Sequence, residues 1–405
     1  APTPAINRLK KWGLSFTQVI SSATMTSPCV SALMTGCYPH VTGIHQLRGD
    51  TLNPALPTLA ELLQANGYRT GALVTGPLWE GLGIERGFEH FEYRKPSPQL
   101  SAAWRDRIRE WSTPGEDTRP WFLYAHFFDL HAPRVVAPEF DRSEFGPTLY
   151  ERAVASLDRR FAEIFGALDW KNTIVVLHAD HGEAYPETAW LEFREKMWQD
   201  VLLGHKPPLM RVGIKRDPTV RAWTGLKRLT RMGHGFGLTE GQVRVPLVIV
   251  GAEDTRAGEE IPAQVRQVDI MPTLLELAGV MPPLQLSGRS LLRVVEGNET
   301  AMRPAYMEAR WFGRDPNFFL RGLRTPEWKY VDSPIDPRVH PQLYALAADQ
   351  KEKRNVLAQH PDIVAELRGL MDQETAAHAP AGAAQAWTAQ ESELVEERLR
   401  NLGYF

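Results

Sequence analysis

Residues 26–40 have the sequence TSPCVSALMTGCYPH, and this stretch decides the fold of the chain. Thr26 stands two residues before Pro28, at the start of an apolar stretch with helical spacing. A hydroxyl at a helix N-terminus lies among free N–H groups and at the positive end of the helix dipole, which together stabilise an oxyanion. The position therefore suits an ester substrate or a covalent ester intermediate. The alternative is that Thr26 only caps the helix, which is the commoner role of a lone threonine.

A second stretch that could carry chemistry follows an apolar run at 172–177. There Asp180 and His181 occupy adjacent positions of a short turn, and Gly182 lets the backbone turn away. A carboxylate and an imidazole placed in this way can both face a divalent cation. On this pattern alone, the alternative is an ordinary solvated loop.

Apolar runs alternate with helical patterns over the first three quarters of the chain. Runs typical of buried strands lie at 69–74, 120–128, 172–177 and 243–250, and helical patterns lie at 58–67, 150–168 and 269–280. The helix at 58–67 is expected to begin with a capping box formed by Thr58 and Glu61. This alternation predicts an α/β fold in which a large mixed sheet lies between helices.

The pattern changes after about residue 297. Residues 321–331 predict a hairpin, residues 362–371 a short amphipathic helix, and residues 391–401 a last helix beyond a flexible linker at 376–385. We therefore expect a larger domain at 1–297, which carries the candidate site, and a small C-terminal α+β domain at 298–405.

The composition is that of an ordinary globular protein. The 405 residues include 46 Lys+Arg and 49 Asp+Glu, and the net charge of −3 argues against nucleic-acid binding by the whole surface. No run reaches the roughly 18 apolar residues of a membrane-spanning helix. Two cysteines, Cys29 and Cys37, give no disulfide framework and no zinc site, and they suit a reducing compartment. With no signal peptide visible in the sequence, a cytoplasmic location is expected.

The segment from Thr26 to Ile44 resembles the signature helix of the sulfatase family within the alkaline phosphatase superfamily. Six further stretches resemble family segments and follow in the family's order: 4–9, 56–61, 67–70, 127–133, 234–247 and 269–274. The resemblance implies a metal-dependent hydrolase of sulfate, phosphate or phosphonate esters. Its substrate would be a small anionic ester.

The resemblance also assigns roles to individual residues. Thr26 falls on the nucleophile position, and Asp180 and His181 fall on ligand positions for a divalent metal such as Ca, Mn or Zn. His131 and His234 fall on positions that contact the transferring group or protonate the leaving oxygen. Two further residues, His126 and Asp129, are expected to bind substrate, although an isolated histidine such as His126 is more often a hydrogen-bonded core residue. Alternatively, Asp129, His131 and His234 could hold a second cation.

One departure from the family concerns the nucleophile itself. The family normally carries a Cys or Ser here that is oxidised to formylglycine, and Thr26 cannot be converted in this way. A threonine alkoxide can still attack phosphorus in line and form a phosphothreonine that water hydrolyses. The sequence therefore predicts hydrolysis of phosphate mono- or diesters without formylglycine, with sulfate-ester hydrolysis as the alternative.

Other departures favour a catalytically defective relative that binds an anion or a partner. Val30 replaces an arginine of the family, and residues 75–79 replace its Lys-Trp-His segment. The family's opening strand and its metal-binding aspartates should precede Ala1. A sheet that lacks this interior strand would have two open edges and a large unfilled core.

A basic insertion is expected at about 184–232. Between residues 196 and 231 there are nine Lys/Arg and two Asp/Glu. This insertion could form a cationic lid over the site or contact anionic lipid. The alternative is a solvated surface insertion whose tryptophans pack on the domain.

Overall fold

The computed structural model describes most of the chain. The described residues are 1–47, 49–113, 115–132, 134–184, 233–251, 257–299, 303–310, 318–377, 393 and 397. The basic insertion beyond Ala184, nearly all of the expected linker and all but residues 393 and 397 of the last helix expected at 391–401 therefore lie outside the described residues.

The sheet that holds the first strand of the chain is mixed. Its order is β5-β6-β1-β7, and its strands are β1 (Leu14–Ile20), β5 (Val175–His178), β6 (Arg244–Val250) and β7 (Glu260–Arg266). Strand β1 pairs antiparallel with β6, where Leu14 is opposite Ile249, and parallel with β7, where Ser15 is opposite Glu260.

Two further sheets complete the architecture of the described residues. A parallel sheet has the order β3-β2-β4, with β2 (Arg69–Val74), β3 (His90–Tyr93) and β4 (Trp121–Ala125). An antiparallel sheet near the C-terminus has the order β11-β10-β9-β8, with β8 (Ala305–Arg310), β9 (Phe319–Arg324), β10 (Trp328–Asp332) and β11 (Gln342–Ala345). The hairpin expected at 321–331 is therefore confirmed.

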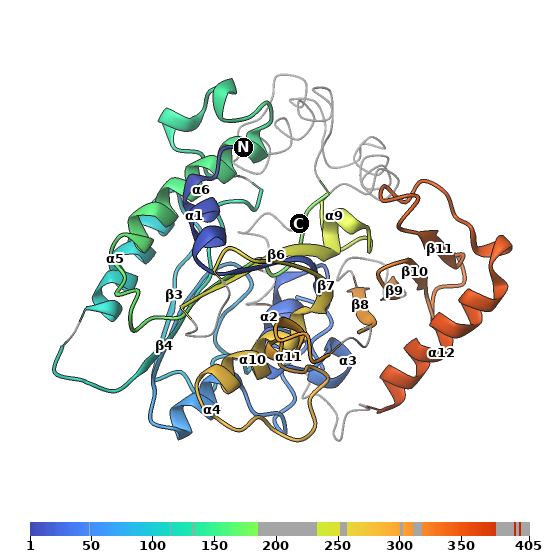
Figure 1. Cartoon of the computed structure of the whole chain (residues 1–405), viewed down its shortest axis with the longest axis horizontal. Coiled ribbons are helices and arrows are strands. Elements are labelled where there is room, and N and C mark those ends of the chain that lie inside the picture. The colour runs from blue at the N-terminus through green and yellow to red at the C-terminus, as the bar shows by residue number, and fades with distance from the viewer. Residues whose placement is uncertain are drawn as a thin grey trace.

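Helices cover both faces of the first two sheets (Figure 1). One face packs against α1 (Pro4–Trp12), α5 (Leu100–Ser112) and α6 (Leu149–Phe165), and the other against α2 (Thr26–Thr35), α4 (Leu59–Ala65) and α10 (Ile270–Leu277). The other α-helices among the described residues are α3 (Pro39–Thr42), α9 (Glu240–Val243), α11 (Leu292–Val295) and α12 (Pro361–Ala377), the last of which packs on the C-terminal sheet. The predicted fold class, helices around a mixed sheet with a small C-terminal α+β unit, is confirmed.

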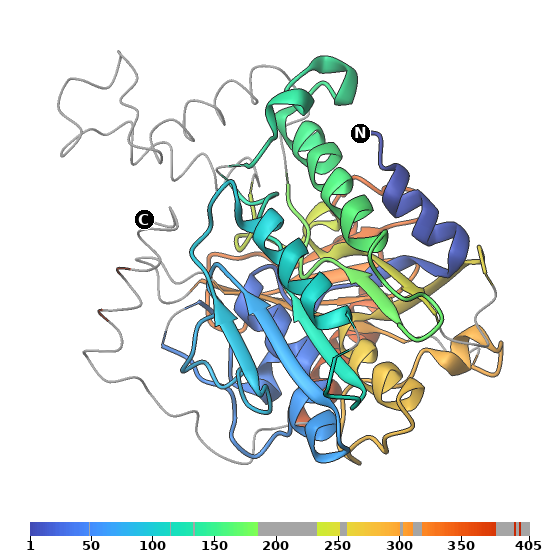
Figure 2. The same ribbon diagram turned by 90° about the vertical axis from the view of Figure 1, so that its left-hand side faces the viewer.

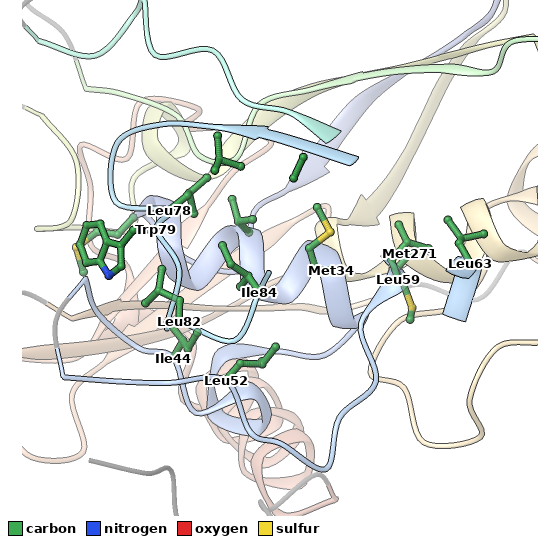
Figure 3. Packing of buried hydrophobic residues seen from close by; sticks show 14 of the residues in the cluster. Met34, Ile44, Leu52, Leu59, Leu63, Leu78, Trp79, Leu82, Ile84 and Met271 are labelled. Carbon is green, nitrogen blue, oxygen red and sulfur yellow. The ribbon is translucent and has the colours of Figure 1, made fainter. Parts of the chain in front are cut away.

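The core on the α2 side is continuous and apolar. Figure 3 shows Met34 of α2, Leu59 and Leu63 of α4 and Met271 of α10 in one cluster, all of them buried. Helix α4 begins with the predicted capping box, because Thr58 Oγ1 accepts from Glu61 N at 3.1 Å while Thr58 N donates to Glu61 Oε2 at 2.8 Å. Both ends of this exchange satisfy backbone or side-chain groups that the first turn would otherwise leave without a partner.

A cavity of about 840 Å³ separates β4 from β5. Its lining includes Asp180 and His181, which directly follow β5, and His126, which directly follows β4. Cys29 and Cys37 are both buried free thiols. Among the described residues, none of the helices has the length and apolarity needed to cross a bilayer.

Candidate active site

Thr26 is held at the start of α2 by a short loop that follows β1. Ser21 N donates to Val243 O at 2.8 Å, and Ser22 N donates to Gln267 Oε1 at 3.1 Å, so the start of this loop is anchored to two other segments of the chain. The helix cap is Met25, and it makes no side-chain capping bond. Thr26 is the first residue inside the helix, so the alternative that it serves only as the cap is wrong.

The Thr26 hydroxyl faces the turn after β5. Its Oγ1 lies 3.3 Å from His181 Nε2, and His181 Nε2 lies 3.5 Å from Asp180 Oδ2. His126, which directly follows β4, places its Nε2 4.0 Å from the same carboxylate oxygen. Four of the predicted residues therefore converge where α2, β4 and β5 meet, and all four line the cavity.

Asp180 is ionised in this setting. Burial by itself raises the pKa of its carboxyl group, but attraction to His181 and His126 and a hydrogen bond from Thr26 outweigh burial and lower the pKa to about 2. Burial also lowers the pKa of both histidines, which are therefore neutral near pH 7. The turn itself is fixed by Gly182 N, which donates to Gln242 O at 2.7 Å.

His234 joins this cluster through a bridge between residues on either side of the insertion. Ala184 and Gly233 exchange two backbone hydrogen bonds, of 3.1 and 2.7 Å. The bridge brings His234 Nδ1 to 3.0 Å from Glu183 Oε2, and the His234 ring centroid lies 4.6 Å from that of His181. The His131 ring lies 5.2 Å from His234, and burial lowers the pKa of His131 to about 3. The two predicted histidines therefore belong to the same site.

Asp129 lies apart from this cluster. Burial raises the pKa of its carboxyl group, a hydrogen bond from Ser101 of α5 lowers it, and the raising effect dominates. Its backbone oxygen accepts from Val135 N at 2.9 Å, and the residue does not line the cavity. Among the described residues, no three His, Cys, Asp or Glu side chains form a group that could hold a metal, so the second-cation alternative has no support.

Three residues of the site were not predicted from the sequence. Glu183 positions His234, and its proximity to Asp180 and His181 was the available signal. Arg134 directly follows the 127–133 segment; it is largely buried, its guanidinium lies 5.2 Å from the Tyr150 ring centroid, and burial lowers its pKa. No pattern in the sequence pointed to Gln267, because it acts on a distant segment. Its Nε2 donates to Asp180 O in the loop after β5, at 2.8 Å.

The fold family implies a divalent metal, and the described residues provide part of a binding site for it. Asp180 Oδ2 is buried and has no hydrogen-bond partner within the part of the chain that the structure describes. A bare carboxylate oxygen beside His181 Nε2 offers two suitable ligand atoms. These two residues alone leave a divalent ion with an incomplete shell.

A buried hydroxyl at a helix N-terminus, facing an imidazole and an ionised carboxylate at the carboxyl ends of strands, is a site built for hydrolysis of an ester bond. The comparisons identify the family. The Sulfatase family model matches residues 1–280, and a model of the C-terminal part of N-sulphoglucosamine sulphohydrolase matches residues 236–377. This chain belongs to the sulfatase family, and its members are ester hydrolases.

Curated relatives include arylsulfatase K from several vertebrates. The chain is 23% identical to arylsulfatase K of Mus musculus over 412 residues, which cover 90% of this chain and 73% of that protein. It is 35% identical to arylsulfatase K of Danio rerio over 144 residues, which cover 35% of this chain and 27% of that protein.

Solved structures with the same fold act on two kinds of ester. The phosphonate monoester hydrolase of Agrobacterium radiobacter has a TM-score of 0.70 at 18% identity, covering 93% of this chain and 91% of that one. A structure in complex with its substrate D-glucosamine-2-N,6-O-disulfate has a TM-score of 0.68 at 17% identity, covering 93% and 91%. At 17–18% sequence identity, these similarities show that the fold is shared.

Proposed function

We propose that this chain hydrolyses a sulfate ester, so that the alternative drawn from the sequence takes precedence over phosphate esters. Support comes from the curated relatives named arylsulfatase K and from the match to the N-sulphoglucosamine sulphohydrolase C-terminal model. The structural observation that supports this proposal is the position of the Thr26 hydroxyl at the N-terminus of α2, where its Oγ1 lies 3.3 Å from His181 Nε2.

In this proposal the sulfate group is bound at the start of α2. The free N–H groups of the first turn and the Thr26 hydroxyl donate to sulfate oxygens, which spread negative charge as the ester bond breaks. Thr26 does not become formylglycine, so water attacks sulfur, the S–O bond to the leaving group breaks, and the products are sulfate and an alcohol. Arg134 supplies a half-buried positive charge that attracts the Glu183 carboxylate.

The leaving oxygen needs a proton, and His234 is the residue placed to supply it. Glu183 Oε2 accepts from His234 Nδ1 and stabilises the imidazolium form of the ring, so His234 Nε2–H faces the ester and gives its proton to the leaving oxygen. His131 packs beside His234 and limits the orientations of that ring.

A divalent cation would be held by Asp180 and His181. When bound, such an ion polarises the ester oxygens as a Lewis acid. Incubation with Ca, Mn or Zn, followed by gel filtration and measurement of the metal content, identifies the ion. We expect the wild-type protein to retain one of these metals and Asp180→Ala to lose it.

Phosphate or phosphonate esters are the second candidate, favoured by the unmodifiable threonine at the nucleophile position. In that reaction Thr26 Oγ1 attacks phosphorus, the leaving group departs with a proton, and water later cleaves the phosphothreonine. The similarity to a phosphonate monoester hydrolase agrees with this candidate.

A substrate panel on Thr26 variants separates the candidates. The panel holds nitrophenyl sulfate, nitrophenyl phosphate, bis-nitrophenyl phosphate and a phenylphosphonate ester, each with Ca, Mn or Zn. We expect the highest kcat/KM on the sulfate, a loss of roughly 100-fold in the nearly isosteric Thr26→Val, and retention of most activity in Thr26→Ser. Faster phosphate turnover together with a trapped phosphothreonine would instead establish the second candidate. A folded protein that turns over no ester would be the non-catalytic relative.

A further inference from the structure

Gln267 stands on a firmly held turn between β7 and α10. It is the first residue of the 3-10 turn Gln267–Asp269, and it is fully buried. The carboxylate of Asp269 accepts from Arg266 N at 3.0 Å and from Arg266 Nη2 at 2.7 Å. Thr273 of α10 donates from its hydroxyl to Asp269 O at 2.6 Å. The backbone that carries the Gln267 side chain is therefore held on both sides.

The side-chain amide of Gln267 reaches three groups on two other segments of the chain. Its Oε1 lies 3.1 Å from Ser22 N, and its Nε2 lies 2.8 Å from Asp180 O and 3.1 Å from His178 Nε2. Ser22 belongs to the loop between β1 and α2, whereas His178 ends β5 and Asp180 follows it. Figure 2 shows β5 in green, and the loop before α2 belongs to the blue part of the chain. One side chain thus joins segments that are far apart in sequence.

Only one orientation of this amide satisfies all three neighbours. A backbone N–H can only donate and a backbone carbonyl can only accept, so Oε1 faces Ser22 N and the NH₂ group faces Asp180 O. The second hydrogen of that NH₂ group points to His178 Nε2, which has to accept it. His178 therefore carries its hydrogen on Nδ1, which donates to Pro246 O of β6 at 2.9 Å. Both N–H groups and the carbonyl oxygen of the buried amide are then paired, as buried polar groups require.

The bond to Ser22 acts on the position of Thr26. Ser22 O also accepts from Glu308 N of β8 at 3.0 Å, so Ser22 is held from two sides. In the next residue, Ala23 O accepts from Cys29 Sγ at 3.1 Å, which ties the loop to the helix that begins at Thr26. A shift of Ser22 therefore shifts the start of α2.

The bond to Asp180 acts on the other half of the site. His181 directly follows Asp180, and its Nε2 lies 3.3 Å from Thr26 Oγ1. This distance joins two segments of different strands, so it depends on side chains that contact both of them. The amide of Gln267 makes such a contact on each side.

We propose that Gln267 is a positioning residue, whose amide sets the separation between Thr26 and the turn that carries Asp180 and His181. This role rests on the proposed function, because it serves the hydrolysis described above. Gln267 acts through Ser22 and Asp180 and donates nothing to the reacting groups. A displacement of about 1 Å at reacting groups can cost about 100-fold in rate, so a loss of this amide should be visible in kcat.

Gln267→Met tests the role, because methionine has a similar size and makes none of the three hydrogen bonds. The matched control is Asn53→Leu, which also removes a buried amide that joins two backbone segments. Asn53 Oδ1 accepts from Ala55 N at 3.0 Å, its Nδ2 donates to Val41 O at 3.5 Å, and none of these residues lines the cavity. Both substitutions leave buried backbone groups unpaired, so both should lower Tm.

The two variants should differ in activity. We expect kcat on the best ester of the panel to fall by roughly tenfold or more in Gln267→Met and to stay within about twofold in Asn53→Leu, with KM changed less than kcat. Hydrogen exchange at Ser22 N should accelerate by roughly tenfold or more in Gln267→Met alone. NMR of nitrogen-labelled histidine in the wild type, assigned with His178→Phe, should show the hydrogen of His178 on Nδ1.

Equal losses of kcat in the two variants would overturn the proposal and leave Gln267 with a packing role. Unchanged exchange at Ser22 in Gln267→Met, or a hydrogen on His178 Nε2 in the wild type, would overturn it as well. A wild type that hydrolyses no ester would instead contradict the proposed function, and the exchange and NMR measurements would still accept or reject the contacts of Gln267 with Ser22 and His178.

Discussion

Glu183 shows how one side chain can determine the orientation of another that lies far away in sequence. It is separated from His234 by the whole insertion, yet its carboxylate holds His234 Nδ1 at 3.0 Å. Burial raises the pKa of Glu183, but attraction to His234 and a hydrogen bond from it outweigh burial and lower the pKa to about 2. A carboxylate that is ionised at neutral pH fixes the tautomer and the direction of the imidazole.

We therefore predict that Glu183→Gln lowers kcat by roughly 100-fold on the best ester of the panel, because a general acid contributes about that much and a neutral amide does not stabilise the imidazolium that donates the proton. KM should change far less, since the sulfate-binding start of α2 is untouched. Steady-state kinetics with Glu276→Gln, an exposed substitution on α10, provide the matched control. Equal kcat in the two variants would remove His234 from the proposed chemistry.

The roles of Thr26, Asp180 and His181 were predicted from the resemblance to the family, because the local pattern alone left a helix cap and a solvated loop open. The structure brings these three side chains together. The sequence was not sufficient for Glu183 and His234 as a pair, because their contact depends on the Ala184–Gly233 bridge. The second-cation alternative needs the side chains of Asp129 and His131, which are two residues apart, to face the same way. That spacing brings side chains to one face only in a strand, and β4 ends at Ala125, so the loop beyond it turns Asp129 toward α5.

At the scale of elements, the loop after β5 depends on close backbone packing against α9. A Cβ added to Gly182 would lie 2.2 Å from Gly241 O, and the Gly182 N–H already donates to Gln242 O. Because both contacts are with backbone, neither can move aside independently of the helix. This contact sets the position of His181 relative to Thr26.

We predict that Gly182→Ala lowers both the Tm and the ester-hydrolysis activity, because the loop must shift to relieve the clash. The matched control is Gly369→Ala in α12, where nothing lies within 4 Å of the added Cβ. That substitution should raise the free energy of unfolding by about 0.5–1 kcal/mol, since alanine is the better helix former. Urea unfolding of both variants tests the pair, and a Gly182→Ala protein as stable and active as wild type would contradict the expected packing.

The elements that the sequence did not reveal have identifiable physical reasons. Strand β7 contains Pro262 and the polar residues Gln264 and Arg266, so it lacks the continuous apolar run that marked β6. The runs at 120–128 and 172–177 are both typical of buried strands, and they do not themselves show which strands lie beside them. Two open edges were expected only from the resemblance to the family, and among the described residues β4 and β5 each pair with a strand on one side only.

At the scale of the whole molecule, a buried ion network ties the C-terminal sheet to the site-bearing part. Lys329 of β10 is fully buried and contacts both Glu352 and Glu240, the latter at 3.1 Å, while Arg324 of β9 lies 2.9 Å from Glu240. Glu240 begins α9, the helix that also holds Gly182. A loss of this network should therefore loosen the site as well as the sheet, because removal of one partner leaves an uncompensated buried charge.

The pH dependence of stability gives this network a direct signature. Burial raises the pKa of Glu240, but the hydrogen bond from Arg324 and attraction to Lys329 outweigh burial and lower the pKa from its ordinary value of 4.5 to about 2. A carboxyl group whose folded pKa is lowered stabilises the protein above its unfolded pKa, and this contribution disappears as the pH falls from about 4.5 to about 2. For Glu240 it amounts to about 3 kcal/mol, because each unit of pKa difference corresponds to about 1.4 kcal/mol.

We predict that Glu240→Gln is less stable than wild type at pH 7 and that the difference shrinks as the pH is lowered to 3. Urea unfolding at both pH values, with the exposed Glu139→Gln as control, checks the sign, and a stability difference that stays constant between pH 7 and pH 3 would show that Glu240 acts through packing and not through its charge.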